Sequence, residues 1–326
     1  MTNIDKSKKE KVKLDIVLKF LFTTSEKVLI NLLNGVFGEN FNVDEVNLSV
    51  SNNEFVDSEL GIIRGDIFFE IANNESNKVN YHIEFQTKND NTMVIRMFEY
   101  GFNKGREILN NHKNKNNKDE IKTIYFPKQR VIFFEENKNI NDILKLRIVF
   151  PDTEEVIYSV PVLKYWEYTD EDLIKNKMYP LLPLQLFTLR KDLENATNNN
   201  DLTRIQELSS KAKFLATKIA HESKELLEKN EIFYDDFHKM LLAIQNLIEY
   251  LNRNFLNDDN IEEEVSTVTK TLYDPEVEKR GVEKGIEAGE KKKAIEIAKN
   301  LLDVLDSETI ATKTGLSLEE VENLRK

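Results

Sequence analysis

The chain has 326 residues, of which 40% are hydrophobic and 32% are charged, and its formal net charge at pH 7 is −12. These proportions predict folded, strongly hydrated domains and exclude a wholly disordered chain. There is no cysteine, which excludes disulfide scaffolds, zinc–thiolate sites, iron–sulfur clusters and a cysteine nucleophile. The four histidines show no metal-ligand spacing, which argues against a zinc protease.

The distribution of charge and apolar residues bears on location and partners. No stretch is long and apolar enough to span a bilayer, and the first 22 residues lack the apolar segment of a signal peptide, so we expect a cytoplasmic protein without a membrane partner. Residues 1–130 hold 19 basic and 19 acidic side chains, whereas residues 131–326 hold 27 and 39. The front part is therefore the more permissive one for a polyanion such as DNA.

The first 168 residues mix strand and helix patterns, which predicts an α/β domain. Short runs of β-branched and aromatic residues predict strands at 46–50, 62–71, 79–86, 121–126, 130–134, 145–150 and 156–160. Apolar residues at helical spacing predict two helices within 15–37 and a third at 91–110, before an exposed loop at 110–118. The strands 62–71 and 79–86 flank a turn cluster, so we expect them to form a hairpin.

The rest of the chain is predicted to be all-α. Helical patterns with little strand signal between them occur at 170–175, 181–193, 201–229, 232–256 and, as two short helices, within 301–325. Asp274-Pro275 breaks the chain before the last of these. We therefore predict three parts, namely a front domain (1–168), a helical region (169–274) and a C-terminal part (275–326).

The C-terminal part has two unusual features. Gly281, Gly285 and Gly289 are four residues apart within a charged segment, and the charges exclude a membrane packing motif. The helix pair around Thr314-Gly315-Leu316 has the size of a helix-turn-helix, and its second helix is predicted to start with a capping box that pairs Ser317 with Glu320. That helix is acidic, so a surface for homo-oligomers and a DNA reader remain equal alternatives.

Polar side chains within the predicted hairpin are candidates for chemistry. Residues two apart on a strand share a face, so Glu84, Gln86 and Lys88 project together. Asp66 is expected roughly opposite residue 85, and a shift of one residue would place it beside Glu84. Asp66 and Glu84 lie in otherwise apolar strands, where a carboxylate is costly without a cation or hydrogen bonds. The pair therefore predicts a magnesium site, although ordinary solvated carboxylates remain the alternative.

The helix predicted after the hairpin offers a phosphate contact. Arg96 and Tyr100 are one turn apart on the same face, and an arginine there could hold a phosphate with two hydrogen bonds. Gln86 or Lys88 could orient the attacking water or contact the scissile phosphate. A surface arginine packed over Tyr100 is the alternative.

The run NNEFVDSELGIIRGDIFFEI…YHIEFQTKNDNTMVIRMFEYGF resembles the Rpn family of recombination-promoting nucleases and putative transposases, which belongs to the PD-(D/E)xK nuclease superfamily. The positions that match the family pattern are Asp66, Glu84, Gln86, Arg96 and Tyr100. The opening LDIVLKFLF is similar to the family's Asp-x-x-Phe-Lys start, with different spacing around Asp15 and Lys19. The ending IEIAKNLLDV…TIATKTGLSLEEVENL and the preceding GVEKGIEAGEK resemble the family's tail.

The resemblance implies a restriction-endonuclease-like core, in which a mixed central sheet is flanked by helices and followed by an all-α C-terminal region. It further implies a magnesium-dependent endonuclease that hydrolyses DNA phosphodiester bonds, with Asp66 and Glu84 as metal ligands. Gln86 stands where the superfamily usually has lysine, which is normal in this family, and Lys88 is a possible substitute. The alternative is a weak or inactive nuclease fold that acts through protein–protein contacts of its helical half.

Overall fold

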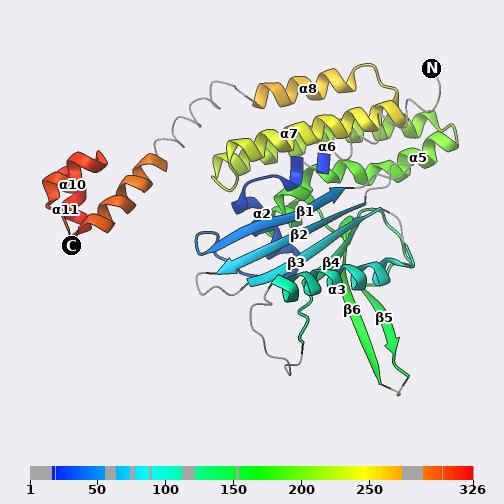
Figure 1. The fold of residues 1–326 in the computed structure, drawn as a ribbon. Helices are drawn as coiled ribbons and strands as arrows, with labels where there is room; N and C mark the ends of the chain where they lie inside the picture. The colour runs from blue at the N-terminus through cyan, green and yellow to red at the C-terminus, as the bar shows by residue number, and fades with distance from the viewer. Residues whose placement is uncertain are drawn as a thin grey trace, which may run out of the picture. The chain divides into compact units, whose positions relative to one another are not determined.

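We describe the protein from a computed structural model, which defines residues 17–18, 20–55, 64–73, 78–87, 90–111, 122–151, 154–273, 289–302 and 304–325 (Figure 1). The chain divides into two compact units, residues 1–272 and residues 273–326, and each is described by itself. The predictions made for Asp15, Lys19, Lys88, Gly281 and Gly285 lie outside the described residues.

The first unit is built on a mixed six-stranded sheet. Its strands are β1 (Val46–Phe55), β2 (Arg64–Asn73), β3 (Lys78–Gln86), β4 (Lys128–Phe133), β5 (Ile143–Val149) and β6 (Glu155–Lys164). They are ordered β1-β2-β3-β4-β6-β5. The central pairs β3/β4 and β4/β6 are parallel, whereas β1/β2, β2/β3 and β5/β6 are antiparallel. The predicted α/β fold with a mixed central sheet and the predicted hairpin are both confirmed.

Helices cover both faces of the sheet. On one face of β3, Glu84 and His82 contact α3 (Met93–Asn111) through Arg96 and Tyr100. On the other face, Tyr81 packs against Phe37 of α2 (Glu26–Phe37). Phe85 lies 4.7 Å from Phe22 between ring centroids. On the opposite face, a buried cluster joins α3 to the strands β4 and β6 through Met93, Met97, Val131, Phe133 and Val160. Both faces of β3 are therefore buried, as expected for a strand in the middle of a covered sheet.

The strand predicted at 121–126 is wrong, because residues 122–127 have no regular secondary structure. This segment crosses α3 closely. A Cβ atom added at Gly101 would come within 2.4 Å of Phe126, and one added at Gly105 within 2.4 Å of Ile124. The apolar residues that suggested a strand are therefore used for packing on a helix, and the two glycines permit that contact.

The helical region of the first unit follows β6. Its elements are η1 (Tyr165–Glu167), α4 (Asp170–Lys175), η2 (Tyr179–Leu189), α5 (Arg190–Asn198), α6 (Leu202–Glu228), α7 (Tyr234–Leu251), η3 (Asn252–Leu256) and α8 (Ile261–Leu272). The single helix predicted at 181–193 is instead a 3₁₀ helix, η2, followed by α5. Pro180 and Pro183 lack the N–H groups that an α-helix needs there. The sequence analysis did not predict α8.

Polar contacts fasten α7 to the start of α2 and join η1 to η2. The backbone and hydroxyl of Ser25, just before α2, donate to the carboxylate of Asp236 on α7 at 2.6 and 2.7 Å. The Tyr165 hydroxyl donates to the Leu181 carbonyl at 2.6 Å. The first contact joins residues 211 positions apart, and the second joins residues 16 positions apart. The first therefore ties α7 to the start of α2, which packs on the sheet.

The second unit is a small helical body. Residues 289–301 are helical and precede α10 (Ser307–Thr314) and α11 (Leu318–Leu324). Its core is formed by Ala298, Ile310, Leu316 and Val321. The predicted capping box of Ser317 and Glu320 is confirmed. Across both units, none of the helices in the described ranges is long and apolar enough to cross a membrane.

Candidate metal and nucleic-acid site

The pairing of β2 with β3 brings the two predicted carboxylate positions together. Asp66 is directly opposite Glu84, one residue from the pairing that the turn position suggested. The next pair on this face is Phe68 and His82, whose rings stack with centroids 4.1 Å apart. Directly paired residues of antiparallel strands share a face, so this register meets the geometric condition of the predicted metal site. Asp66 is described only through its backbone pairing.

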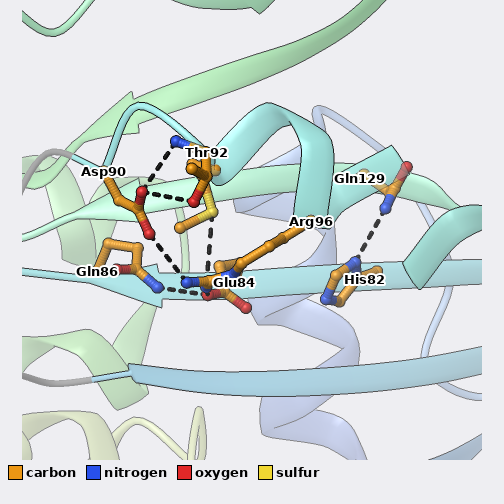
Figure 2. A network of polar contacts seen from close by, with 8 residues as sticks. His82, Glu84, Gln86, Asp90, Thr92, Arg96 and Gln129 are labelled. Carbon is orange, nitrogen blue, oxygen red and sulfur yellow. Dashed lines mark hydrogen bonds and ion pairs between the residues drawn. The ribbon is translucent and has the colours of Figure 1, made fainter. Parts of the chain in front are cut away.

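Glu84 is the centre of the polar contacts under α3 (Figure 2). The residue is 1% exposed, and its Oε1 atom accepts hydrogen bonds from the Gln86 side-chain amide and from Nη2 of Arg96. Its Oε2 atom is buried and has no hydrogen-bond partner among the described residues. A buried carboxylate oxygen without a donor is costly, so this atom is the place where an additional cation would be most stabilising.

Arg96 connects Glu84 to the start of α3. Its Nη1 atom donates to Oδ2 of Asp90 at 3.1 Å. The other carboxylate oxygen of Asp90 accepts from the backbone and hydroxyl of Thr92 at 2.8 and 2.7 Å, which forms an Asx turn at the beginning of the helix. Sequence reasoning missed Asp90, although an aspartate two residues before a threonine at a helix start is a recognisable turn signal.

A second polar group lies one turn further along α3. Gln129 on β4 donates to the Met97 carbonyl at 2.7 Å and to Nδ1 of His82 at 3.0 Å, and it accepts a hydrogen bond from the Tyr158 hydroxyl. The amide nitrogen of Gln129 thus faces both the Met97 carbonyl and Nδ1 of His82, so Nδ1 accepts this hydrogen bond. Burial raises the pKa of the Tyr158 hydroxyl, which keeps it a donor.

The structure thus assembles part of the predicted site. Glu84, Gln86 and Arg96 are in mutual contact. Tyr100 lies beside His82 instead, with ring centroids 5.5 Å apart in an edge-to-face arrangement. Arg96 is held by two carboxylates rather than packed over Tyr100 as a surface arginine. Lys88 lies outside the described residues.

The donor set fits a hard divalent cation. Glu84 supplies an unpaired oxygen, and the register puts Asp66 directly across the strand pair. Mg²⁺ is commonly held by one or two carboxylates and keeps several waters. Within the described side chains there is no group of three or more acidic or histidine residues that could hold a metal. The prediction requires the carboxylates of Asp66 and Glu84 as protein donors, and the strand register pairs these two positions.

Comparison with known proteins identifies a family that part of the chain resembles. Residues 13–127 match a family model described as "Putative transposase, YhgA-like". No curated protein and no solved structure gave a match to the chain. The matched range contains β2, β3 and α3, and with them all six residues of the predicted site. The resemblance seen in the sequence is thereby confirmed over residues 13–127, which are similar to the family of YhgA-like putative transposases.

Proposed function

We propose that the protein is a metal-dependent endonuclease that hydrolyses DNA phosphodiester bonds, with Asp66 and Glu84 as the ligands of Mg²⁺. The observation that supports this proposal best is the buried Oε2 atom of Glu84, which has no partner among the described residues, on a residue that the strand register pairs directly with Asp66. A strand position in a covered sheet would be more stable with an apolar side chain. The carboxylate is therefore best explained by a ligand.

The roles of the neighbouring residues follow from their contacts. Bound Mg²⁺ would supply Lewis acidity and lower the pKa of its water. Gln86 donates to Glu84 and so fixes the orientation of that carboxylate. Arg96 is at the border of the site and carries a charge that suits a phosphate of the DNA backbone. Lys88 and Tyr100 are proposed as further DNA contacts.

Two findings, the family description and the distribution of charge, support DNA as the substrate. The matching family is described as a transposase family, and transposition requires contact with DNA. The front 130 residues have equal numbers of basic and acidic side chains, whereas the remainder carries the whole net charge of −12. Since an acidic surface repels DNA, the front domain with the hairpin is the proposed DNA-binding part.

A plasmid-nicking assay tests the proposal. The wild type should nick supercoiled DNA with Mg²⁺ and stop when EDTA is added. Loss of a residue that only hydrogen-bonds to a metal ligand costs roughly 10- to 100-fold in activity. Asp66→Asn and Glu84→Gln each change a proposed ligand itself, so each should lose more activity than that. Glu99→Gln, an exposed glutamate on the same helix as Arg96, serves as the control and should stay active. Full activity of Glu84→Gln would rule out the metal site.

One observation favours a second candidate function. Arg96 already neutralises Glu84, so the protein could keep the nuclease fold without cleaving DNA and act through protein contacts of its acidic helical half. This alternative predicts that the folded wild type neither nicks DNA nor binds Mg²⁺. The nicking assay together with a binding titration therefore separates the two functions.

A further inference from the structure

We infer that Arg96 is the internal counter-ion of the metal site, an inference that rests on the proposed function. In the metal-free protein its guanidinium group takes the place of the cation on Glu84. When a divalent cation binds, Arg96 leaves that carboxylate, stays attached to Asp90, and turns the released nitrogen toward a phosphate of the substrate. Arg96 is thus a positioning residue for the metal as well as a substrate contact.

The burial of Glu84 explains why a counter-ion is needed. Its side chain is 2% exposed, and a carboxylate at such a depth requires a cation or several donors. Gln86 supplies a single neutral donor. Within the described part of the chain, Arg96 is the cation that contacts Glu84. Without it, the metal-free site would hold a buried and uncompensated negative charge.

The same contact must oppose metal binding. A guanidinium group stays protonated at every pH that a folded protein tolerates. Arg96 therefore cannot lose its charge to make room for a second cation and has to move instead. A divalent ion and a guanidinium on one carboxylate would repel each other, since like charges a few ångströms apart in a buried site interact strongly. Metal affinity in the wild type is consequently lowered by the work of displacing Arg96.

The structure also provides the path for this displacement. The Arg96 side chain is 23% exposed and therefore lies between the buried carboxylate and solvent. Its Nη1 atom is held separately by Asp90, which is itself fixed by the Asx turn at the start of α3. Its Nε atom is buried without a hydrogen-bond partner among the described residues. Among the described residues, Nη2 contacts Glu84 and, at 3.9 Å, the sulfur of Met93, so these two contacts have to break, while Asp90 retains the side chain at the edge of the site.

Removal of the charge should therefore have two effects of opposite sign. Arg96→Gln should weaken the metal-free fold, because Glu84 loses its counter-ion. It should also tighten metal binding, because no cation has to be displaced. A residue that only binds DNA would leave metal affinity unchanged, and a residue that only supports the fold would weaken both properties.

The test measures Mn²⁺ binding to the full-length protein by calorimetry without DNA, together with the melting temperature of the metal-free protein. Arg96→Gln should bind Mn²⁺ at least about tenfold more tightly than the wild type, which corresponds to about 1.4 kcal/mol, and should melt at a lower temperature. Arg96→Lys keeps the charge and should bind Mn²⁺ within about threefold of the wild type. Arg106→Gln, at an exposed arginine of α3, should match the wild type in both measurements.

Two results would overturn the inference, and only the second would also contradict the proposed function. If Glu84→Gln abolishes Mn²⁺ binding while Arg96→Gln leaves it unchanged or weaker, Arg96 is not a counter-ion and the proposed metal site stands. If the wild type binds no Mn²⁺, or if Glu84→Gln binds it normally, both the inference and the proposed function fail. If Arg96→Gln is unfolded without metal, circular dichroism with added Mn²⁺ tests the inference. Mn²⁺ should restore the helical signal if Arg96 takes the place of the cation, and no recovery would contradict the inference.

Discussion

Replacement of Gln129 by leucine is expected to destabilise the protein strongly, although the two side chains are similar in size. Gln129 is 8% exposed and makes three hydrogen bonds that join β3, β4, β6 and α3. Leucine would leave Nδ1 of His82 and the Tyr158 hydroxyl without their partner, while the Met97 carbonyl keeps its helical hydrogen bond. A buried group without a partner costs about 1–3 kcal/mol, so the loss for the two groups together should be about 2–6 kcal/mol.

Equilibrium urea unfolding is the suitable assay, because the single tryptophan, Trp166, packs against the core cluster beneath α3 and reports on this region. Gln206→Leu, at an exposed position of α6, is the matched control and should change the free energy of unfolding by less than about 0.5 kcal/mol. A loss below about 1 kcal/mol for Gln129→Leu would refute the inferred network.

A double-mutant cycle tests the network directly. Tyr158→Phe alone should cost about 1 kcal/mol, because it removes one hydrogen bond. In the Gln129→Leu background the same change should cost almost nothing, since the acceptor is already absent. The coupling free energy should therefore exceed about 0.5 kcal/mol. Additive effects of the two substitutions would show that the hydroxyl and the amide do not interact.

Two further predictions concern the helical region. Burial raises the pKa of Glu222 from 4.5 to about 7, with a smaller contribution from the adjacent Asp170. The folded state therefore binds this proton more tightly than the unfolded state. The resulting stability is complete below pH 4.5 and is lost as the pH rises through 7. Glu222→Gln should accordingly gain up to about 3 kcal/mol relative to the wild type between pH 4.5 and about pH 8, measured by urea unfolding, and a pH-independent difference would contradict this. A fragment of residues 1–272 should be soluble and monomeric by size-exclusion chromatography, whereas residues 1–168 alone should aggregate because the cut exposes the apolar face that the helices cover; a monodisperse 1–168 fragment would show that this face is dispensable.

Much of the fold could be predicted because local patterns agree with the tertiary structure. The runs 62–71 and 79–86 combine strand-forming residues with a turn cluster, and they form β2 and β3 within two residues of those limits. Errors arose where an apolar run serves another purpose. The run 121–126 has strand composition, but its described residues 122–126 lie against α3. This packing depends on the small size of Gly101 and Gly105, which the local sequence pattern around 121–126 does not reveal.

The candidate site was predictable in its strand positions and less so in its contacts. Alternation within β3 predicted that Glu84 and Gln86 share a face, which the hydrogen bond between them confirms. The pairing of Asp66 was uncertain by one residue, because the length of the turn cannot be fixed from its composition. The contact of Arg96 with Glu84 was not predicted, since it depends on how α3 is placed over the sheet.

The buried polar side chains of β3 beneath α3 cost stability in the middle of the sheet. His82, Glu84 and Gln86 occupy three consecutive α3-facing positions of β3, and all three are buried. Apolar side chains there would need no Gln129 and no Arg96, and replacement of buried ion pairs by well-packed apolar residues is often neutral or stabilising. The compensation is also incomplete, because Glu84 retains one oxygen without a partner among the described residues. Stability therefore does not account for these side chains, whereas the proposed cation site beside Arg96 would account for both the carboxylate and its unpaired oxygen.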